Sequence, residues 1–233
     1  MAMGYSSYIP AQKIEDEAMS VLAAYAQKYK EPITAPVPIE EILDCLYDVT
    51  IEAADLRAKY QNDDVLAEFL VGRNRKVILI DQTIHPDFNA DKEGRYRFTL
   101  GHETGHWILH QHLLASVNTD NLFDDELKPV SVYRTSCKEP KEKQADMFSG
   151  YILMPKDLIL QEWEAKFGPD HGPENVYEEI REKSERFQTE PENIRCDLAR
   201  EFAIKFKVSA QTMQIRLHDM GLLELAEPEP RLF

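Results

Sequence analysis

The pentapeptide HETGH at residues 102–106, within the run RYRFTLGHETGHWILHQH, restricts this chain more than any other feature. On an α-helix His102 and His106 lie one turn apart on the same face, roughly 6 Å along the axis, so both imidazoles can bind one tetrahedral Zn²⁺. Glu103 follows the first histidine and would stand beside the metal, where it can take a proton from water. The spacing therefore predicts a zinc-dependent hydrolase site on a helix.

The surroundings of this motif favour a genuine site over a chance occurrence of HExxH. The apolar residues that would bury the helix beside the site are Phe98, Leu100, Trp107, Ile108 and Leu109. Their spacing is that of an amphipathic helix. Gly105 stands inside this helix at a cost of about 1 kcal/mol relative to alanine, which predicts that room is left there for a close approach.

The third ligand that catalytic zinc usually requires must come from elsewhere. His110 continues the spacing of four but would lie about 12 Å along the axis from His102, too far to bind the same ion. His112 has the offset of the third histidine in the metzincin pattern HExxHxxGxxH, yet this chain has Leu109 where that pattern has its glycine. Neither histidine is therefore the expected ligand.

Residues 142–154, EKQADMFSGYILM, are a second strongly helical stretch, which ends at Pro155. We expect Glu142 to be the third ligand. Asp146 stands four residues later on the same helix face and can accept the remaining N–H of a liganding histidine, which fixes its tautomer. In isolation both acids would be interpreted as solvated helix residues, but a neighbouring HExxH helix favours the metal-site interpretation.

These segments resemble the ImmA/IrrE-type metallopeptidases. The run RFTLGHETGHWILH is similar to their pattern RFTxAHExGHxxLH, and ExxAD followed by FSGYILMP is similar to ExxANxFAxxLLMP. Gly101 replaces the usual alanine, and Ser149 and Gly150 replace small alanines, none of them at a ligand position. The resemblance covers roughly residues 35–160 well and residues 198–223 more loosely.

The resemblance implies an α+β fold with a zincin-like metallopeptidase core, in which a small β-sheet packs on the HExxH helix, and a C-terminal helical extension of helix-turn-helix type. The expected organisation is an N-terminal helix at 1–34, the metallopeptidase domain at 35–188, a helix-turn-helix-like segment at 189–226 and a flexible tail at 227–233. The resemblance further implies one Zn²⁺ as cofactor. The implied substrate is a helix-turn-helix repressor, whose cleavage releases genes for stress response, mobile-element transfer or phage defence.

Composition agrees with a globular enzyme. The 233 residues, 43% of them hydrophobic, can bury a substantial core. A formal net charge of -15 argues against general nucleic-acid affinity, because an acidic surface repels phosphate unless a basic patch overrides it. Such a surface suits a basic partner such as a DNA-binding repressor, although solvation alone explains it equally well.

The cysteines and the start of the chain predict a cytoplasmic protein. Cys45, Cys137 and Cys196 form no paired framework, and the start of the chain has no apolar export segment. No stretch approaches the roughly 20 apolar residues that span a bilayer, so no membrane association is expected.

Apolar periodicity predicts further elements around the site. Helices are expected at 11–30, 39–46, 155–167 and 173–187, and a β-hairpin at 67–72 and 76–81. A strand beside the catalytic helix could bind an extended peptide by edge pairing; a purely structural sheet is the alternative. Residues 115–138 are polar and are expected to form a long irregular loop between the two metal-bearing helices.

Cys137 lies in this polar segment, five residues before Glu142. A thiolate there would be able to occupy the fourth position on zinc, displace the water and hold the enzyme inactive. Oxidation or a conformational change would then release it. An unremarkable loop cysteine is the alternative.

Residues 191–223 have the apolar spacing of two helices joined by a turn at Val208 and Ser209. DNA reading by this unit is weakly supported, since Gln211, Gln214 and Arg216 are few basic or base-reading groups. A packing or partner-docking role is therefore favoured.

The expected mechanism follows from the charges of these groups. Zinc held by His102, His106 and Glu142 would lower the pKa of its water and polarise the scissile carbonyl. Glu103 would remove the water proton and deliver it to the leaving amine.

Some roles and alternatives stay open at this stage. Tyr133, Arg134 and Tyr151 are candidates for a second oxyanion donor, and the sequence leaves that role unassigned. Two other function classes are a DNA-associated regulator dominated by residues 198–223 and a catalytically inactive, zinc-stabilised interaction module. The intact Glu103 speaks against the inactive module.

Overall fold

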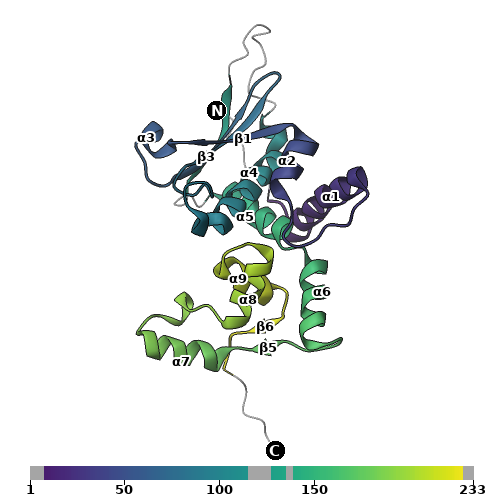
Figure 1. Cartoon of the computed structure of the whole chain (residues 1–233), viewed down its shortest axis with the longest axis vertical. Coiled ribbons are helices and arrows are strands. Elements are labelled where there is room, and N and C mark those ends of the chain that lie inside the picture. The colour runs from purple at the N-terminus through teal and green to yellow at the C-terminus, as the bar shows by residue number, and fades with distance from the viewer. Residues whose placement is uncertain (1–7, 115–126, 135–138, 228–233) are drawn as a thin grey trace, which may run out of the picture. The chain divides into compact units, whose positions relative to one another are not determined.

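A four-stranded mixed sheet with helices packed against it forms the first of two units in the computed structural model, which describes residues 8–114, 127–134 and 139–227 (Figure 1). The units are Met1–Leu153 and Met154–Phe233. The small sheet and the several helices confirm the α+β class and fit a zincin-like core. No helix among the described residues is both long and apolar enough to span a bilayer.

The first unit contains α1 (Ala11–Tyr29), α2 (Ile39–Tyr47), β1 (Val49–Ala54), α3 (Leu56–Tyr60), β2 (Val65–Val71), β3 (Lys76–Asp81), the 3-10 helix η1 (Ala90–Lys92), α4 (Glu93–Leu114), β4 (Lys128–Arg134) and α5 (Pro140–Leu153). The strand order is β1-β3-β2-β4, with β1 parallel to β3 and the other neighbours antiparallel. The inner strands are therefore β2 and β3, and β4 lies at one edge.

The inner strands β2 and β3 form the predicted hairpin, which is confirmed. Nearly all of β2 is buried, because it has a strand on each side and contacts on both faces. On one face the ring of Phe69 packs on Trp107 of α4, with centroids 5.6 Å apart. On the other face Glu68 forms an ion pair with Lys59 of α3. A strand covered in this way has a nearly continuous apolar run rather than an alternating pattern.

The expectation of an irregular loop over residues 115–138 is wrong for residues 128–134, which form β4 along the outer side of β2. The sequence of this strand contains lysine, proline, serine and arginine, which are typical of a loop. An edge strand nevertheless tolerates proline and polar side chains. The pairing of β4 with β2 also skips Val130, as a β-bulge does, and this further breaks the alternation.

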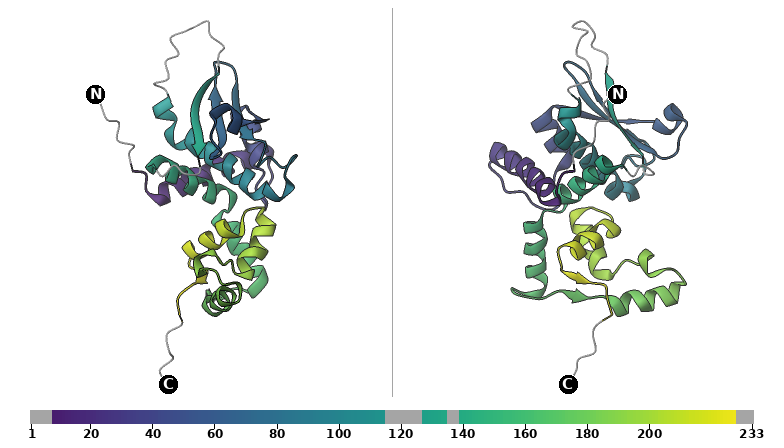
Figure 2. Two further views of the ribbon diagram at one scale, coloured as in Figure 1. Left: turned by 90° about the vertical axis from the view of Figure 1, so that its left-hand side faces the viewer. Right: turned by 180° about the vertical axis from the view of Figure 1, so that it is seen from behind.

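Helix α4 contacts the strands β2, β3 and β4 and also packs on α5, while α1 packs on α5 in turn (Figures 1 and 2). The predicted helices at 11–30 and 39–46 are thus confirmed as α1 and α2. Helix α5 starts at Pro140, where the missing N–H costs little, and ends shortly before Pro155. The two helices predicted to carry the metal site are therefore in direct contact.

The second unit contains α6 (Lys156–Phe167), β5 (Glu174–Asn175), α7 (Tyr177–Phe187), the 3-10 helix η2 (Pro191–Asn193), α8 (Asp197–Phe206), α9 (Ala210–Asp219) and β6 (Leu223–Glu224). Helices α8 and α9 confirm the predicted helix-turn-helix pattern, with Lys207 left-handed at the end of α8 and Ser209 capping α9. The predicted helix at 155–167 is confirmed as α6. The one expected at 173–187 begins only at Tyr177, after the short strand β5, which pairs in parallel with β6.

Helices α6 and α7 both pack with α8. The rings of Trp163 in α6 and Phe202 in α8 lie 6.0 Å apart, and Lys183 of α7 pairs with Asp197 of α8 at 2.6 Å. The division of the chain after Leu153 therefore differs from the boundary at 188 predicted for the metallopeptidase domain. Likewise α1, predicted as a separate N-terminal segment, belongs to the first unit because it packs on α5.

Candidate metal centre

Helix α4 carries the first two predicted ligands and the predicted general base. His102 and Glu103 are fully buried, and His106 is nearly so. The imidazoles of His102 and His106 come from neighbouring turns, and their Nε2 atoms lie 3.0 Å apart. The HExxH spacing on a helix produces this convergence.

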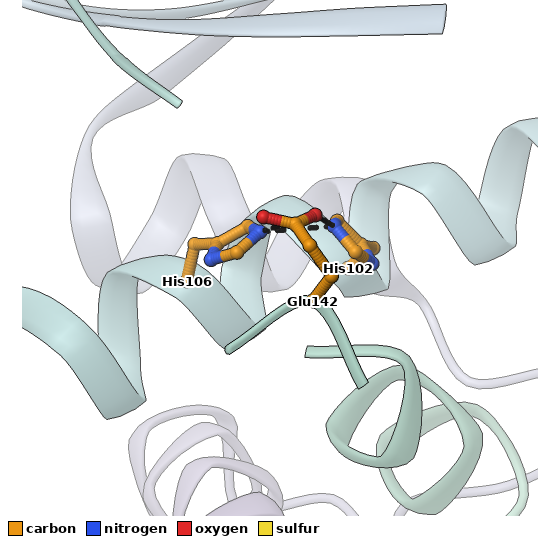
Figure 3. A group of neighbouring side chains, drawn as sticks. All are labelled: His102, His106 and Glu142. Atoms are coloured by element: carbon orange, nitrogen blue, oxygen red, sulfur yellow. Dashed lines mark hydrogen bonds and ion pairs between the residues drawn. The ribbon is translucent and has the colours of Figure 1, made fainter. Parts of the chain in front are cut away.

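Helix α5 brings Glu142 to the same point (Figure 3). Its Oε2 lies 3.2 Å from Nε2 of His102 and 3.3 Å from Nε2 of His106. A tetrahedral zinc with bonds of about 2.0–2.1 Å separates its ligand atoms by about 3.3 Å. The three donor atoms thus have the spacing of one face of such a tetrahedron. Among the described residues they form the one group of His, Cys, Asp and Glu donors that could hold a metal ion.

Asp146 lies one turn further along α5 and contacts the other ring nitrogen of His102. Its Oδ1 lies 2.8 Å from Nδ1 of His102. An ionised carboxylate can only accept a hydrogen bond, so the neutral imidazole carries its proton on Nδ1 and keeps the lone pair of Nε2 for a metal. Asp146 therefore lies where it would select the tautomer that a metal ligand requires.

The carboxylates also change the protonation of the site. Burial alone lowers the pKa of His102, but hydrogen bonds to Asp146 and Glu142 outweigh burial and raise the pKa to about 9. Burial raises the pKa of Glu142, yet hydrogen bonds to His102 and His106 lower it far below its ordinary range. The site thus favours a positive charge between these side chains, which either a proton or a metal cation can supply.

Two glycines allow α4 and α5 to approach closely enough for this geometry. A Cβ atom at Gly105 would lie 3.0 Å from the Cα of Ala145 and 3.1 Å from its carbonyl oxygen. A Cβ atom at Gly101 would lie 2.5 Å from Oγ of Ser149. The prediction that Gly105 marks a close approach is confirmed, and the approaching segment is the helix that carries Glu142.

Strand β4 contributes two side chains whose contacts the sequence does not predict. Ser131 donates a hydrogen bond to Oε2 of Glu103. The ring of Tyr133 lies over the imidazole of His102, with centroids 4.0 Å apart. Burial raises the pKa of Tyr133, so its hydroxyl keeps its proton. No local signal marks Ser131, because its contact depends on how strands and helices distant in sequence come together.

The remaining candidates lie elsewhere or outside the described residues. His110 is buried, its Nε2 lies 3.4 Å from a backbone carbonyl of α5, and it is not one of the three converging donors, as expected. Tyr151 is half-buried on α5. Cys137 and the side chains of His112 and Arg134 lie outside the part of the chain that the structure describes, so the cysteine switch stays a prediction.

Comparison with known families identifies the same region. The profile of the IrrE N-terminal-like domain, which defines the peptidase M78 family, matches residues 56–218. The match includes both the HExxH helix and the helix that carries Glu142 and Asp146. A search of curated proteins returns no match. Because the matched region covers more than half of the chain, the protein belongs to the IrrE N-terminal-like (ImmA/IrrE, peptidase M78) family of metallopeptidases.

Proposed function

We propose that this protein is a zinc-dependent endopeptidase that cleaves a helix-turn-helix transcriptional repressor at a specific site. The observation that carries the proposal is the convergence of His102, His106 and Glu142 beside the buried carboxylate of Glu103. Two imidazoles and one carboxylate leave the fourth position of a tetrahedral zinc open, as catalytic sites require. Membership of a metallopeptidase family supports the same class of reaction.

The chemistry of peptide hydrolysis fits the groups present. A bound Zn²⁺ would polarise the scissile carbonyl and lower the pKa of a water molecule at the open position. Glu103 accepts the proton as the water attacks the peptide carbon, and later passes it to the leaving amine. Oε1 of Glu103 is buried and has no hydrogen-bond partner among the described residues. A buried carboxylate oxygen is costly without a polar partner, which supports a role in meeting the attacking water.

The substrate would bind as an extended chain along β4. Among the described strands, β4 lies at the edge of the sheet, and one of its faces lies against α4 at Glu103 and His102. A peptide that pairs with the outer edge of β4 would be held by backbone hydrogen bonds beside the metal site. This places substrate recognition on the edge strand rather than on the predicted hairpin.

A basic DNA-binding repressor suits this protein as a substrate. The net charge of -15 favours association with a partner of opposite charge. The control of stress, mobile-element or phage-defence genes by that repressor follows from the family resemblance alone.

The second unit fits partner docking better than DNA reading. On α9 the side chains of Gln214 and Arg216 are buried and hydrogen-bond to backbone atoms within the unit. A recognition helix must expose its base-reading side chains. Of the three candidates, only Gln211 is exposed. The DNA-associated regulator is therefore the less favoured function.

The test is to incubate the zinc-loaded protein with the repressor encoded by a neighbouring gene and to measure intact masses. We expect one pair of products whose masses sum to the repressor plus water. Glu103→Gln should bind zinc and the repressor but leave it intact, whereas Glu139→Gln, at an exposed position, should cleave normally. A zinc-loaded wild-type protein that cuts no such repressor would contradict the proposal. Metal-dependent folding without cleavage would instead indicate the inactive interaction module.

A further inference from the structure

Ser131 contacts the carboxylate on which the proposed reaction depends. Its Oγ donates a hydrogen bond from β4 to Oε2 of Glu103 on α4. Glu103 is fully buried, and within the described parts of the chain its other oxygen, Oε1, accepts no hydrogen bond. The two oxygens of the Glu103 carboxylate therefore differ: Oε2 accepts from Ser131, and Oε1 can accept from a different donor.

A β-bulge accompanies this placement of the serine. The pairing of β4 with β2 skips Val130, so that Ser131 lies directly opposite Phe69. Paired residues on adjacent strands point to the same face of a sheet. Phe69 points to α4, where its ring meets that of Trp107, and Ser131 therefore points to α4 as well. Bulges beside active sites commonly re-aim a side chain, and here the extra residue adjoins the serine that reaches the helix.

We propose that Ser131 is a positioning residue for the general base, which holds Oε2 of Glu103 so that Oε1 faces the attacking water. This inference rests on the proposed peptidase function. A carboxylate free to rotate presents either oxygen in many orientations, whereas a charge-assisted hydrogen bond from a hydroxyl fixes one of them. The proton of the water goes to Glu103, and Ser131 acts only through it.

Replacing the serine tests this role in the working enzyme. In Ser131→Ala we expect kcat to fall about 10- to 100-fold, a part of the roughly 10²- to 10⁴-fold that a positioned base contributes. KM and the zinc content should stay unchanged, because the metal ligands are untouched. Ser131→Thr keeps the hydroxyl on a side chain that strands favour and should restore most of kcat. If Ser131→Thr loses as much kcat as Ser131→Ala, the hydroxyl is not the group that positions Glu103, and the proposal is overturned.

Thr50→Ala is the matched control on a strand away from the site. Thr50 is exposed on β1, at the opposite edge of the sheet from β4. It should leave kcat within about twofold, since no contact with Glu103 is lost. A fall in kcat as large as that of Ser131→Ala would assign the effect to general damage to the sheet and would overturn the proposal.

A second measurement needs neither zinc nor substrate. Thermal unfolding of metal-free Ser131→Ala, Glu103→Ala and the double variant gives a double-mutant cycle. If the two side chains are bonded, the change in Tm of the double variant differs from the sum of the two single changes. Additive changes would overturn the proposal, because they would show that Ser131 and Glu103 do not interact.

The outcomes separate this inference from the proposed function. A wild-type protein that cleaves no repressor contradicts the proposed function directly. Cleavage by the wild-type protein, with kcat unchanged in Ser131→Ala, leaves the peptidase in place and overturns the positioning role alone.

Discussion

Oδ1 of Asp146 lies 2.8 Å from Nδ1 of His102, so a carboxylate on α5 fixes the orientation of an imidazole on α4. Asp146→Ala removes this acceptor, and zinc affinity should fall about 10- to 100-fold, the usual cost of losing such a partner. Asp146→Asn keeps an oxygen acceptor and matches the ImmA/IrrE pattern, so it should lose much less. Chelator competition compares the proteins; equal zinc affinity in the wild type and Asp146→Ala would contradict this role.

The raised pKa of His102 predicts that zinc binding releases a proton. Hydrogen bonds to Asp146 and Glu142 overcome burial and raise this pKa to about 9, so the metal-free site holds the proton at neutral pH. Between about pH 7 and 8.5, zinc affinity should rise about tenfold per pH unit. Calorimetric titration in buffers of different ionisation enthalpy counts the proton. Asp146→Ala should show a flatter dependence, and a pH-independent wild-type affinity would refute the explanation.

The same shift sets the pH dependence of stability in the metal-free protein. The folded state raises the pKa of His102 from its ordinary value of 6.5 to about 9, so folding strengthens proton binding. This contribution is complete below about pH 6.5 and is lost as the pH rises through about 9. Scanning calorimetry should therefore show the Tm of the metal-free protein falling across this window relative to Asp146→Ala. A rise of the wild-type Tm relative to Asp146→Ala across this pH window would contradict the prediction.

Gly101 and Ser149 are complementary in size. A Cβ atom at Gly101 would meet Oγ of Ser149 at 2.5 Å, and that hydroxyl also donates to the carbonyl of Phe98 at 2.7 Å. Gly101→Ala should lower the free energy of unfolding by about 1–3 kcal/mol through overpacking. Adding Ser149→Ala removes the closest atom, while Cα and Cβ of residue 149 stay 3.2 Å from the added methyl group. Alanine also gains about 1 kcal/mol of helix propensity over glycine, so the double variant should recover part of the loss. Denaturant unfolding measures both; a double variant no more stable than Gly101→Ala would contradict this account.

Gln214 has a structural role in the second unit. Its side chain accepts from the N–H of Cys196 at 2.9 Å and donates to the carbonyl of Ile194 at 3.2 Å. Gln214→Ala should destabilise this unit by about 1–3 kcal/mol, because buried backbone groups lose their partner. Gln211→Ala, at an exposed position of the same helix, should change stability by less than about 0.5 kcal/mol.

Tryptophan fluorescence can follow this unit separately. The chain has two tryptophans, and Trp163 lies in the second unit, so a Trp107→Phe background reports on α6 and its neighbours. Equal unfolding midpoints for the Gln214→Ala and Gln211→Ala proteins would show that Gln214 does not stabilise the helix pair.

The parts of the site that lie on single helices could be predicted from the sequence. Helical periodicity alone places His106 one turn after His102, with Glu103 beside them, and Asp146 one turn after Glu142. A close approach at Gly105 was also predictable, because a glycine inside a helix has a cost that close packing explains. The glycine alone did not show which segment approaches.

The contributions of β4 could not be predicted in this way. Ser131 and Tyr133 lie on an edge strand whose polar composition is typical of a loop, and the bulge at Val130 breaks its alternation. Their contacts with Glu103 and His102 depend on the register between β4 and β2, which is a long-range property. The packing of α6 and α7 with α8 escaped prediction for the same reason, since periodicity shows that a helix has an apolar face but not which neighbour covers it.

The most direct test of the central claim is the zinc content of the purified protein after extensive dialysis, measured by plasma mass spectrometry. The three converging donors predict one zinc per chain in the wild type and in Glu103→Gln, and loss of that zinc in a folded Glu142→Ala protein. A wild-type protein without bound transition metal, or a Glu142→Ala protein that retains zinc with unchanged affinity, would contradict the claim that these residues form a catalytic zinc site.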